Sequence, residues 1–344
     1  MQASAITLDG VWKVFGAKAA EAMAAIRRDG LGKAEILSRY DCVVGVADAS
    51  FKVAPGEIFC IMGLSGSGKS TLVRHVNRLI EPTAGRIEIE GIDVGALEPE
   101  KLRQLRAEKI GMVFQNMALL PHRTVRDNVT FALELRGVDP YQRLLAADRV
   151  IATVGLTGYG DRYPSELSGG MQQRVGLARA LAADPDILLM DEPFSALDPL
   201  IRRQLQDEFL RLSEQMHKTT LFITHDLDEA IRMGDRIAIM KDGRIVQIGT
   251  PEQIVTAPAD DYVADFVKGI SRLKLVTASK IMVPYMAAGL DPTVCPVARP
   301  DTYLDELVDM AVASEHPIII EDAGARVGVI TKSTLLRGIQ GGSA

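Results

Sequence analysis

One stretch decides the fold of this 344-residue chain: Glu57-Ile-Phe-Cys-Ile-Met-Gly63-Leu-Ser-Gly-Ser-Gly-Lys69-Ser70. It opens with a short, largely apolar run of the kind found in buried parallel strands. The run leads into the pattern G-x-x-x-x-G-K-[ST], and a helix is expected from about residue 70 to 79. Glycines let the backbone wrap tightly, so that amide groups and the helix N-terminus converge on a phosphate chain. The stretch therefore predicts a nucleotide phosphate site between a strand and a helix, rather than a plain loop.

A second motif completes this site. Ile187-Leu-Leu-Met-Asp191-Glu192 is an apolar run that ends in two acidic residues. Ligands bind at the carboxyl ends of the strands in an open parallel sheet. We therefore expect Asp191 and the hydroxyl of Ser70 to face Mg²⁺, and Lys69 to contact the β- and γ-phosphates. Glu192 is placed to orient and deprotonate the attacking water.

The rest of the pattern indicates an α/β fold. Short apolar runs at 187–190, 220–224 and 237–240 alternate with helical stretches, which is typical of a parallel sheet. Residues 6–16 and 42–53 predict further strands, residues 17–39 one or two short helices, and residues 86–94 a hairpin arm. Residues from about 125 to 181 are expected to be mostly helical. The pattern changes near residue 268, and a separate small unit is expected after it.

Composition excludes several classes of protein. The length suggests about two domains of roughly 150 residues each. With 47% hydrophobic and 24% charged residues, the chain is not mainly disordered. Its net charge of −6 argues against nucleic-acid binding, which requires a basic surface. The three cysteines are widely spaced and predict neither a disulfide framework nor a zinc site, which fits a reducing compartment. No apolar run approaches the ~20 residues that cross a bilayer.

Further motifs narrow the prediction. Leu167-Ser168-Gly169-Gly170-Met171-Gln-Gln-Arg174 precedes the acidic strand, with Ser168 as a natural helix N-cap and glycines that leave amides open to an anion. Gln115 lies in Val-Phe-Gln, Asp198 ends Ser195-Ala-Leu-Asp198, and His225 lies in Ile-Thr-His-Asp. Together with the phosphate loop, and in the same order along roughly residues 6–255, these motifs resemble those of the ATP-binding-cassette (ABC) ATPases.

The resemblance implies a P-loop (RecA-like) core with an antiparallel β subdomain and a helical subdomain at about 116–178, all within an ABC domain spanning 1–268. It implies ATP and Mg²⁺ as cofactors. The catalytic residues would be Lys69, Glu192 and His225, and the metal ligands Ser70, Gln115 and Asp191. The residues that would contact the nucleotide are Phe15, Gly63, Ser65, Gly66, Ser67, Gly68, Lys69, Ser70, Thr71, Gln115, Ser168, Gly169, Gly170 and Asp198.

The same resemblance assigns individual roles. Gln115 would ligate Mg²⁺ and report the state of the nucleotide to the helical subdomain. His225 would contact the γ-phosphate, and Asp198 would bridge two protomers. Phe15 fits the aromatic residue that stacks on adenine, although an ordinary strand residue is the alternative.

Family ATPases close as head-to-tail homodimers. Ser168 and Gly170 of one chain would then complete the phosphate site of the other. The general family pattern has Gln at the position of Met171, so one polar contact is missing from this signature.

Several blocks are similar to one importer subgroup. They are the insertion at about 17–40, Asn77-Arg-Leu-Ile-Glu-Pro82, Met112-Val-Phe-Gln-Asn-Met-Ala-Leu-Leu-Pro-His122 and the Met-containing signature. That subgroup comprises the ATPases of quaternary-amine importers, for glycine betaine, choline, proline betaine or proline. The implied partners are an integral-membrane permease and an extracytoplasmic substrate-binding protein. The chain is thus expected at the cytoplasmic face of the inner membrane, held there by the permease.

The C-terminal residues 269–344 form the second expected domain. Residues 279–340 predict the order strand, helix, strand, strand, helix, which resembles one cystathionine-β-synthase (CBS) motif. Its seven basic and eight acidic residues give no polybasic strap for a membrane. The unit either regulates transport, in response to ionic strength or a nucleotide, or stabilises a dimer. Pairing across the ATPase dimer would cover a face that a single motif leaves open.

Other functions remain as alternatives. An importer ATPase for another small solute, such as histidine or another amino acid, shares the same motifs. A non-transport ABC ATPase is disfavoured because translation factors carry two cassettes and repair ATPases carry a long coiled coil. A small-molecule P-loop kinase is disfavoured by the signature and by His225.

Overall fold

The computed structural model describes residues 4–115, 117–195, 197–268, 270–285 and 293–340. The chain divides into two compact units, Met1–Ile248 and Gly249–Ala344. This division lies earlier than the boundary after residue 268 that the sequence predicts. The reason is local packing: Arg272 donates a hydrogen bond to the carbonyl of Val255, and Thr277 donates one to Glu252. These contacts join the segment after Ile248 to the C-terminal unit.

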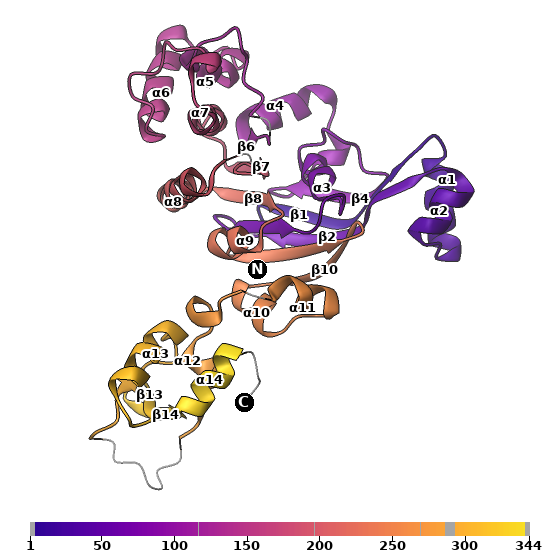
Figure 1. Ribbon diagram of the computed structural model, residues 1–344. Helices are drawn as coiled ribbons and strands as arrows, with labels where there is room; N and C mark the ends of the chain where they lie inside the picture. The colour runs from indigo at the N-terminus through magenta and orange to yellow at the C-terminus, as the bar shows by residue number, and fades with distance from the viewer. Residues whose placement is uncertain (1–3, 116, 196, 269, 286–292, 341–344) are drawn as a thin grey trace. The chain divides into compact units, whose positions relative to one another are not determined.

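The first unit contains a 4-stranded antiparallel sheet in the order β2-β1-β4-β5 (Figure 1). Its strands are β1 (Ile6–Phe15), β2 (Val43–Val53), β4 (Ala84–Ile89) and β5 (Ile92–Asp93). Between β1 and β2 lie two helices, α1 (Ala19–Asp29) and α2 (Lys33–Tyr40), where the sequence predicted one or two. This pair has a small core of its own, around Met23, Ile26 and Ile36.

A 6-stranded sheet in the order β10-β9-β3-β8-β7-β6 forms the centre of the unit. β9, β3, β8, β7 and β6 pair in parallel. The strands are β3 (Ile58–Met62), β6 (Ile110–Val113), β7 (Ile187–Asp191), β8 (Thr219–Thr224), β9 (Arg236–Lys241) and β10 (Arg244–Gly249). Every residue of β3, β7 and β8 is buried, as expected for central parallel strands.

Helices lie next to the strands of this sheet along the chain: one follows each of β3, β7 and β8, and one precedes β6. They are α3 (Lys69–Val76), α4 (Pro99–Lys109), α8 (Pro199–Met216) and α9 (Leu227–Met233), with a 3-10 turn at Val94–Ala96. α3 ends before the predicted residue 79, because Arg78 adopts a left-handed conformation with φ of 53° that a helix cannot continue. The predicted α/β class with an antiparallel β subdomain is confirmed.

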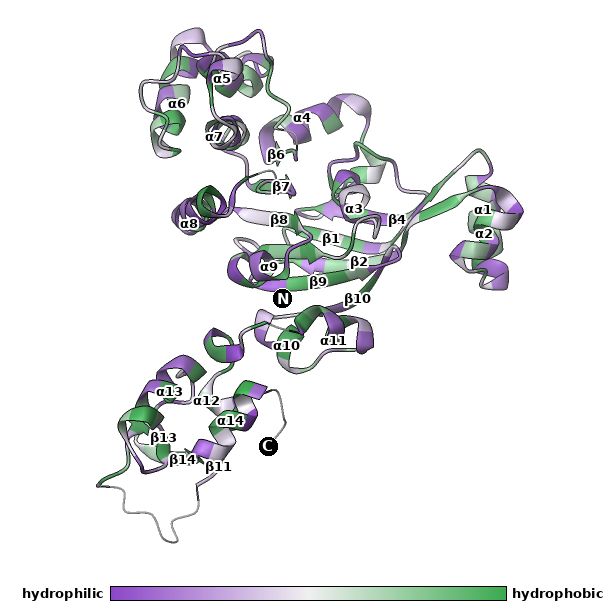
Figure 2. Ribbon diagram, viewed as in Figure 1, coloured by the Kyte–Doolittle hydropathy of each residue, from purple (hydrophilic) through white to green (hydrophobic). Residues whose placement is uncertain are grey.

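Stacked aromatic rings join the two sheets. The ring of Phe51 on β2 stacks on that of Phe59 on β3, with centroids 4.9 Å apart and an interplanar angle of 5°. Ile61 and Leu72 are fully buried in the same core. Hydrophobic residues dominate the strands in Figure 2, whereas α4 is largely hydrophilic. The phosphate loop after β3 thus begins from a buried core that the two sheets share.

A helical subdomain is formed by α5 (Val125–Leu135), α6 (Pro140–Thr153) and α7 (Gly169–Leu181), with a 3-10 turn at Pro164–Glu166. The three helices group together in Figure 1. Asn128 is fully buried, accepts a hydrogen bond from the amide of Leu120 and donates to the carbonyl of Thr124. It thereby fixes the segment that enters α5.

The second unit contains a 4-stranded sheet in the order β11-β14-β13-β12. Its elements are α10 (Pro251–Thr256), α11 (Asp261–Val267), a 3-10 turn (Arg272–Lys274), α12 (Ala278–Ile281), β11 (Val283–Pro284), β12 (Val297–Ala298), α13 (Leu304–Ala313), β13 (Ile318–Asp322), β14 (Ala325–Ile330) and α14 (Lys332–Gln340). The predicted helix, strand, strand and helix that end the unit are α13, β13, β14 and α14, but its opening differs: residues 278–281 form a short helix, and two short strands, β11 and β12, precede α13. Leu304, Ile318 and Ile330 lie in its core.

Candidate functional site

The glycine-rich loop between β3 and α3 is held by two close backbone approaches. Gly63 has a φ of 154°, and a Cβ at this position would come within 2.2 Å of the carbonyl oxygen of Met240. Gly68 has a φ of 102°, and its Cβ would lie 2.3 Å from the carbonyl oxygen of Gly45 on β2. Neither position accepts a side chain, because both the conformation and the space require glycine. The loop is therefore fixed against both sheets.

Lys69 is buried at the start of α3. Its ammonium donates to the carbonyls of Gly63 (2.8 Å) and Leu64 (3.0 Å), so the side chain lies inside the curve of the loop. Burial lowers the pKa of Lys69, and the carboxylates of Asp191 and Glu192 oppose this shift. An anion bound in the loop would stabilise the charged form further.

The loop offers several groups that suit a phosphate chain. An α-helix leaves its first amides without an intrahelical acceptor, so those of Lys69, Ser70 and Thr71 are available to a ligand. Ser67 is 5% exposed, and within the described residues its buried hydroxyl has no hydrogen-bond partner. These donors, with the ammonium of Lys69, fit the phosphates of a nucleotide.

Asp191 lies at the carboxyl end of β7 and is 1% exposed. It accepts a hydrogen bond from the hydroxyl of Ser70 (2.8 Å) and pairs with the guanidinium of Arg74 (3.2 Å). A carboxylate beside a hydroxyl is a donor set that suits Mg²⁺. Sequence reasoning missed Arg74, although its spacing of four residues from Ser70 places both on the same face of α3.

Glu192 connects two segments at the edge of the sheet. Its carboxylate accepts a hydrogen bond from the side-chain amide of Gln115 (3.3 Å) and lies 3.1 Å from Nδ1 of His225. Glu192 itself has a φ of 47°, a left-handed conformation fixed by the hydrogen bond from its amide to the carbonyl of Ile223. The structure thus brings together Gln115, Glu192 and His225, which lie far apart in the sequence.

Phe15 lies beside the phosphate loop. Its ring is 40% exposed and packs against Gly45, whose carbonyl oxygen is the atom that approaches Gly68. The ammonium of Lys13 lies 5.1 Å from the centre of the same ring. A partly exposed aromatic ring that packs on Gly45, which itself contacts the loop, is well placed to stack on a base.

The signature residues lie elsewhere in the unit. Ser168 caps α7 and accepts a hydrogen bond from the amide of Met171 (3.3 Å), whereas Asp198 caps α8 through the amides of Leu200 and Ile201. A Cβ on Gly169 would meet no atom within 4 Å. Across the described part of the chain, no hydrogen bond or ion pair joins residues 168–170 or Asp198 to the phosphate loop.

Arg202 on α8 is a second residue that sequence reasoning missed. Its guanidinium donates to the carbonyls of Ser195 and Leu197 and pairs with Asp226, the neighbour of His225. It therefore ties the segment before Asp198 to the segment that carries His225. No sequence motif predicts the role of this residue, because its partners are mainly backbone carbonyls.

Comparison with known proteins agrees with this geometry. A family model described as "ABC transporter" matches residues 46–195. The glycine betaine/carnitine transport ATP-binding protein of Listeria monocytogenes is 54% identical over 81% of this chain and 70% of its own length. The chain belongs to the ABC transporter family. It is the ATP-binding, ATP-hydrolysing subunit of such a transporter.

Two further relatives extend the comparison of this ABC subunit. The trimethylamine N-oxide transport ATP-binding protein of Ruegeria pomeroyi is 47% identical over 98% of this chain and 97% of its own length. A solved ATP-binding cassette, a dimer in a post-hydrolysis state with ADP and Pi, is 30% identical with a TM-score of 0.61, covering 72% of this chain and 98% of that one. Within the described residues, no helix is both long and apolar enough to cross a bilayer.

We predict that Lys69→Ala weakens ATP binding by roughly 10–100-fold or more, because a charged donor to the phosphates is lost. Equilibrium titration with a fluorescent ATP analogue measures this affinity. The matched control is Lys109→Ala, since that ammonium pairs with Glu90 and Asp186. Equal affinities for the two variants would overturn the assignment of the phosphate loop.

We predict that Glu192→Gln keeps ATP binding but lowers the rate of hydrolysis by about 10²–10⁴-fold, the usual effect of losing a general base. Steady-state release of phosphate and gel filtration with ATP measure turnover and accumulation of an ATP-bound dimer. Glu134→Gln, at an exposed residue paired with Arg123, serves as the control. Hydrolysis close to the wild-type rate would show that Glu192 is not the base.

Proposed function

We propose that this ABC subunit powers the uptake of a quaternary amine or a proline-like osmolyte, such as glycine betaine, choline or proline betaine, through a partner permease. The observation that carries this proposal is the extent of identity to subunits named for transport of such solutes. The relatives include a glycine betaine/proline betaine protein of Escherichia coli and a choline protein of Bacillus subtilis.

Trimethylamine N-oxide is a second candidate substrate. The relative named for it is 47% identical over 98% of this chain. All these solutes share a nitrogen that carries several carbon substituents. A histidine or other amino-acid importer remains the alternative that a transport assay must exclude.

We propose that Mg²⁺ is held by Ser70, Asp191 and Gln115. The ion would neutralise charge on the β- and γ-phosphates when bound. Because these residues supply few ligands, the phosphate oxygens and water would complete its shell. Glu192 accepts the proton of the attacking water. Its contacts with Gln115 and His225 hold the carboxylate in one orientation. Phe15 supports the adenine base.

Two copies of the chain would form a head-to-tail dimer. Ser168, Gly169 and Gly170 lie at the exposed start of α7, with open space at Gly169 and no bond to their own phosphate loop. The amides at a helix start suit an anion. The γ-phosphate bound to a second copy would be such an anion. Asp198, which caps the next helix, would lie at the same interface.

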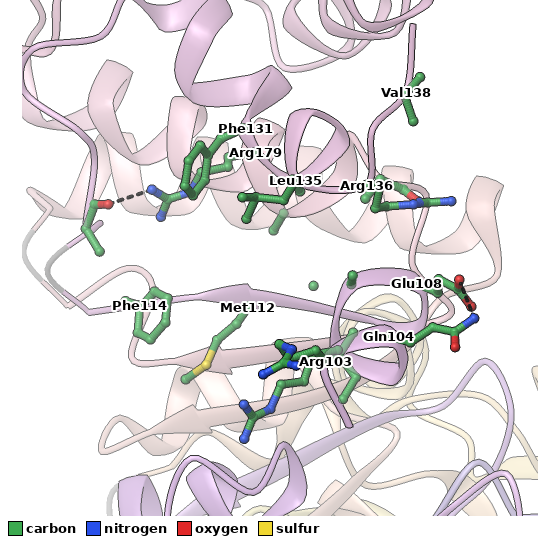
Figure 3. Close-up of a pocket in the computed structure, with 18 of the residues that line it drawn as sticks. Arg103, Gln104, Glu108, Met112, Phe114, Phe131, Leu135, Arg136, Val138 and Arg179 are labelled. Atoms are coloured by element: carbon green, nitrogen blue, oxygen red, sulfur yellow. Dashed lines mark hydrogen bonds between the residues drawn. The ribbon is translucent and has the colours of Figure 1, made fainter. Parts of the chain in front are cut away.

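The surface that would receive the permease is a cavity of about 940 Å³ between α4, β6, α5 and α7 (Figure 3). Leu135 is 72% exposed there, with Phe131 on the same wall of the cavity and Met112 on the opposite wall, so an apolar surface faces solvent. Phe114 lines the same cavity and directly precedes Gln115, which bonds to Glu192. Binding of a partner in this cavity would therefore alter the position of the Glu192 carboxylate through Gln115. Recruitment through this surface would place the chain at the cytoplasmic face of the membrane.

The second unit, with its CBS-like order of elements, would regulate transport or stabilise the dimer. A regulatory unit predicts that removing the residues after Lys268 alters the salt response of uptake. A unit that only stabilises the dimer predicts weaker dimerisation and an unaltered salt response. A substrate-binding protein outside the membrane would supply the solute in either case.

We predict that mixing Lys69→Ala chains with Ser168→Arg chains restores hydrolysis. In a head-to-tail dimer, one site of each mixed dimer carries both lesions and the other carries neither, so about a quarter of all sites recover after random exchange. As the matched control, Lys69→Ala chains are mixed with Lys69→Ala/Ser168→Arg chains, which leave no site intact. If exchange is shown and activity does not return, the site is not shared between chains.

We predict ATP-driven uptake of methylated amines by proteoliposomes that contain the chain, its permease and its substrate-binding protein. Radiolabelled glycine betaine, choline, trimethylamine N-oxide and histidine are compared, and vesicles with Glu192→Gln chains give the background. Saturable uptake of at least one methylated amine supports the proposal. Uptake of histidine alone would overturn it while leaving the ATPase assignment intact.

A further inference from the structure

The backbone at Met117 and Ala118, two and three residues after Gln115, has an unfavourable conformation. Met117 and Ala118 have φ values of 53° and 49°, so two successive residues with side chains lie in the left-handed region. Such residues are uncommon there and persist only where their surroundings impose the conformation. Some contact must therefore hold this segment.

Arg179 on α7 supplies that contact. Its Nη1 donates to the carbonyl of Ala118 (2.5 Å) and its Nη2 to the carbonyl of Met117 (2.7 Å). Figure 3 shows the first of these bonds, at the wall of the cavity beside Phe131. A planar guanidinium can bind two neighbouring acceptors at once, which an ammonium cannot match.

Arg179 has no acidic partner among the residues that the structure describes. Burial alone lowers its pKa, with no carboxylate to oppose the shift. A half-buried cation that is satisfied by two carbonyls depends on their geometry. The left-handed segment and the arginine therefore stabilise each other.

Arg179 and the carbonyls that it holds lie between two parts of the site. On one side lies Gln115, whose amide reaches Glu192. On the other side lies α7, which is capped by the signature residue Ser168 and also packs against Met117 through Gly176. A displacement of α7 would shift the carbonyls that Arg179 holds.

We propose that Arg179 is a positioning residue for hydrolysis. By holding the carbonyls of Met117 and Ala118, it keeps the side chain of Gln115 within reach of Glu192 and ties that side chain to the helix of the signature. Arg179 touches no reacting atom itself. The inference rests on the role proposed for Gln115, which Gln115→Ala tests separately.

The experiment measures hydrolysis and nucleotide binding by the full-length chain. Arg179→Met should lower kcat by on the order of 10–100-fold, because a misplaced group near the reacting atoms is costly, while affinity for a fluorescent ATP analogue stays within about twofold. Arg179→Lys keeps the charge but loses the planar guanidinium that binds both carbonyls, so an intermediate loss of kcat is expected. Thermal unfolding of each variant verifies that it is folded.

Two matched comparisons separate positioning from packing. Arg78 donates to the carbonyls of Val94 and Leu97 and does not line this cavity, so Arg78→Met removes an equivalent pair of bonds without touching the segment after Gln115. It should leave kcat unchanged. Adding Ala118→Gly to Arg179→Met, or to Arg179→Lys if the Met variant does not fold, should recover part of kcat because glycine adopts the left-handed conformation freely.

A double-mutant cycle gives the deciding result. In a Gln115→Ala background, Arg179→Met or Arg179→Lys should cause no further loss, because the positioned side chain is already gone. The inference would be overturned if the arginine substitution lowered kcat as much in the Gln115→Ala background as in the wild type. Failure of Ala118→Gly to restore activity would also overturn it. If Gln115→Ala hydrolyses ATP normally, the role proposed for Gln115 fails. If Gln115→Ala impairs hydrolysis but the Arg179 variants do not, the role of Gln115 stands and only the positioning role of Arg179 fails.

Discussion

The close approach of two glycines to neighbouring backbone is the constraint on which the rest of the site depends. Gly63 lies against the carbonyl of Met240 on β9, and Gly68 against that of Gly45 on β2, so the phosphate loop is fixed between the two sheets. The carbonyl of Ser67 also accepts a hydrogen bond from the amide of Gly243. Because the loop cannot relax, its amides and Lys69 remain aimed at one point before a nucleotide arrives, which reduces the cost of ordering on binding.

The two adjacent carboxylates of the site depend on the same arrangement. Asp191 and Glu192 are adjacent in the sequence but serve different partners, because the left-handed conformation of Glu192 turns the chain at the end of β7. Asp191 thus faces Ser70, whereas Glu192 faces Gln115 and His225. Arginines hold the surrounding backbone: Arg202 binds the carbonyls near Asp198, and Arg179 those after Gln115. The site is therefore a set of rigid loops whose positions are linked through backbone carbonyls.

Motifs with a strict spacing were the predictable part of this protein. The pattern around Lys69 and Ser70 places donors by local geometry alone, and the apolar run before Asp191 places a buried strand, so both were predictable before any tertiary contact was known. A place for Gln115 at the site was expected only by resemblance to a family, and its hydrogen bond to Glu192 was not predicted. Arg74, Arg179 and Arg202 were missed, since each acts on groups whose position only the folded chain determines. The segment at 249–268 was placed in the first domain by sequence, but it packs with the second.

The sequence alone thus determined the class of fold, the phosphate loop and the carboxylates, because strand burial and glycine conformations are local properties. Tertiary structure decided which loops meet. Gln115 and Glu192 come together only because β6 and β7 are neighbours in the sheet. The left-handed backbone at Met117 and Ala118 exists because Arg179, distant in sequence, is held beside it by α7. Parallel strand pairing and guanidinium-to-carbonyl hydrogen bonds join residues that are distant in sequence, so no local sequence pattern predicts them.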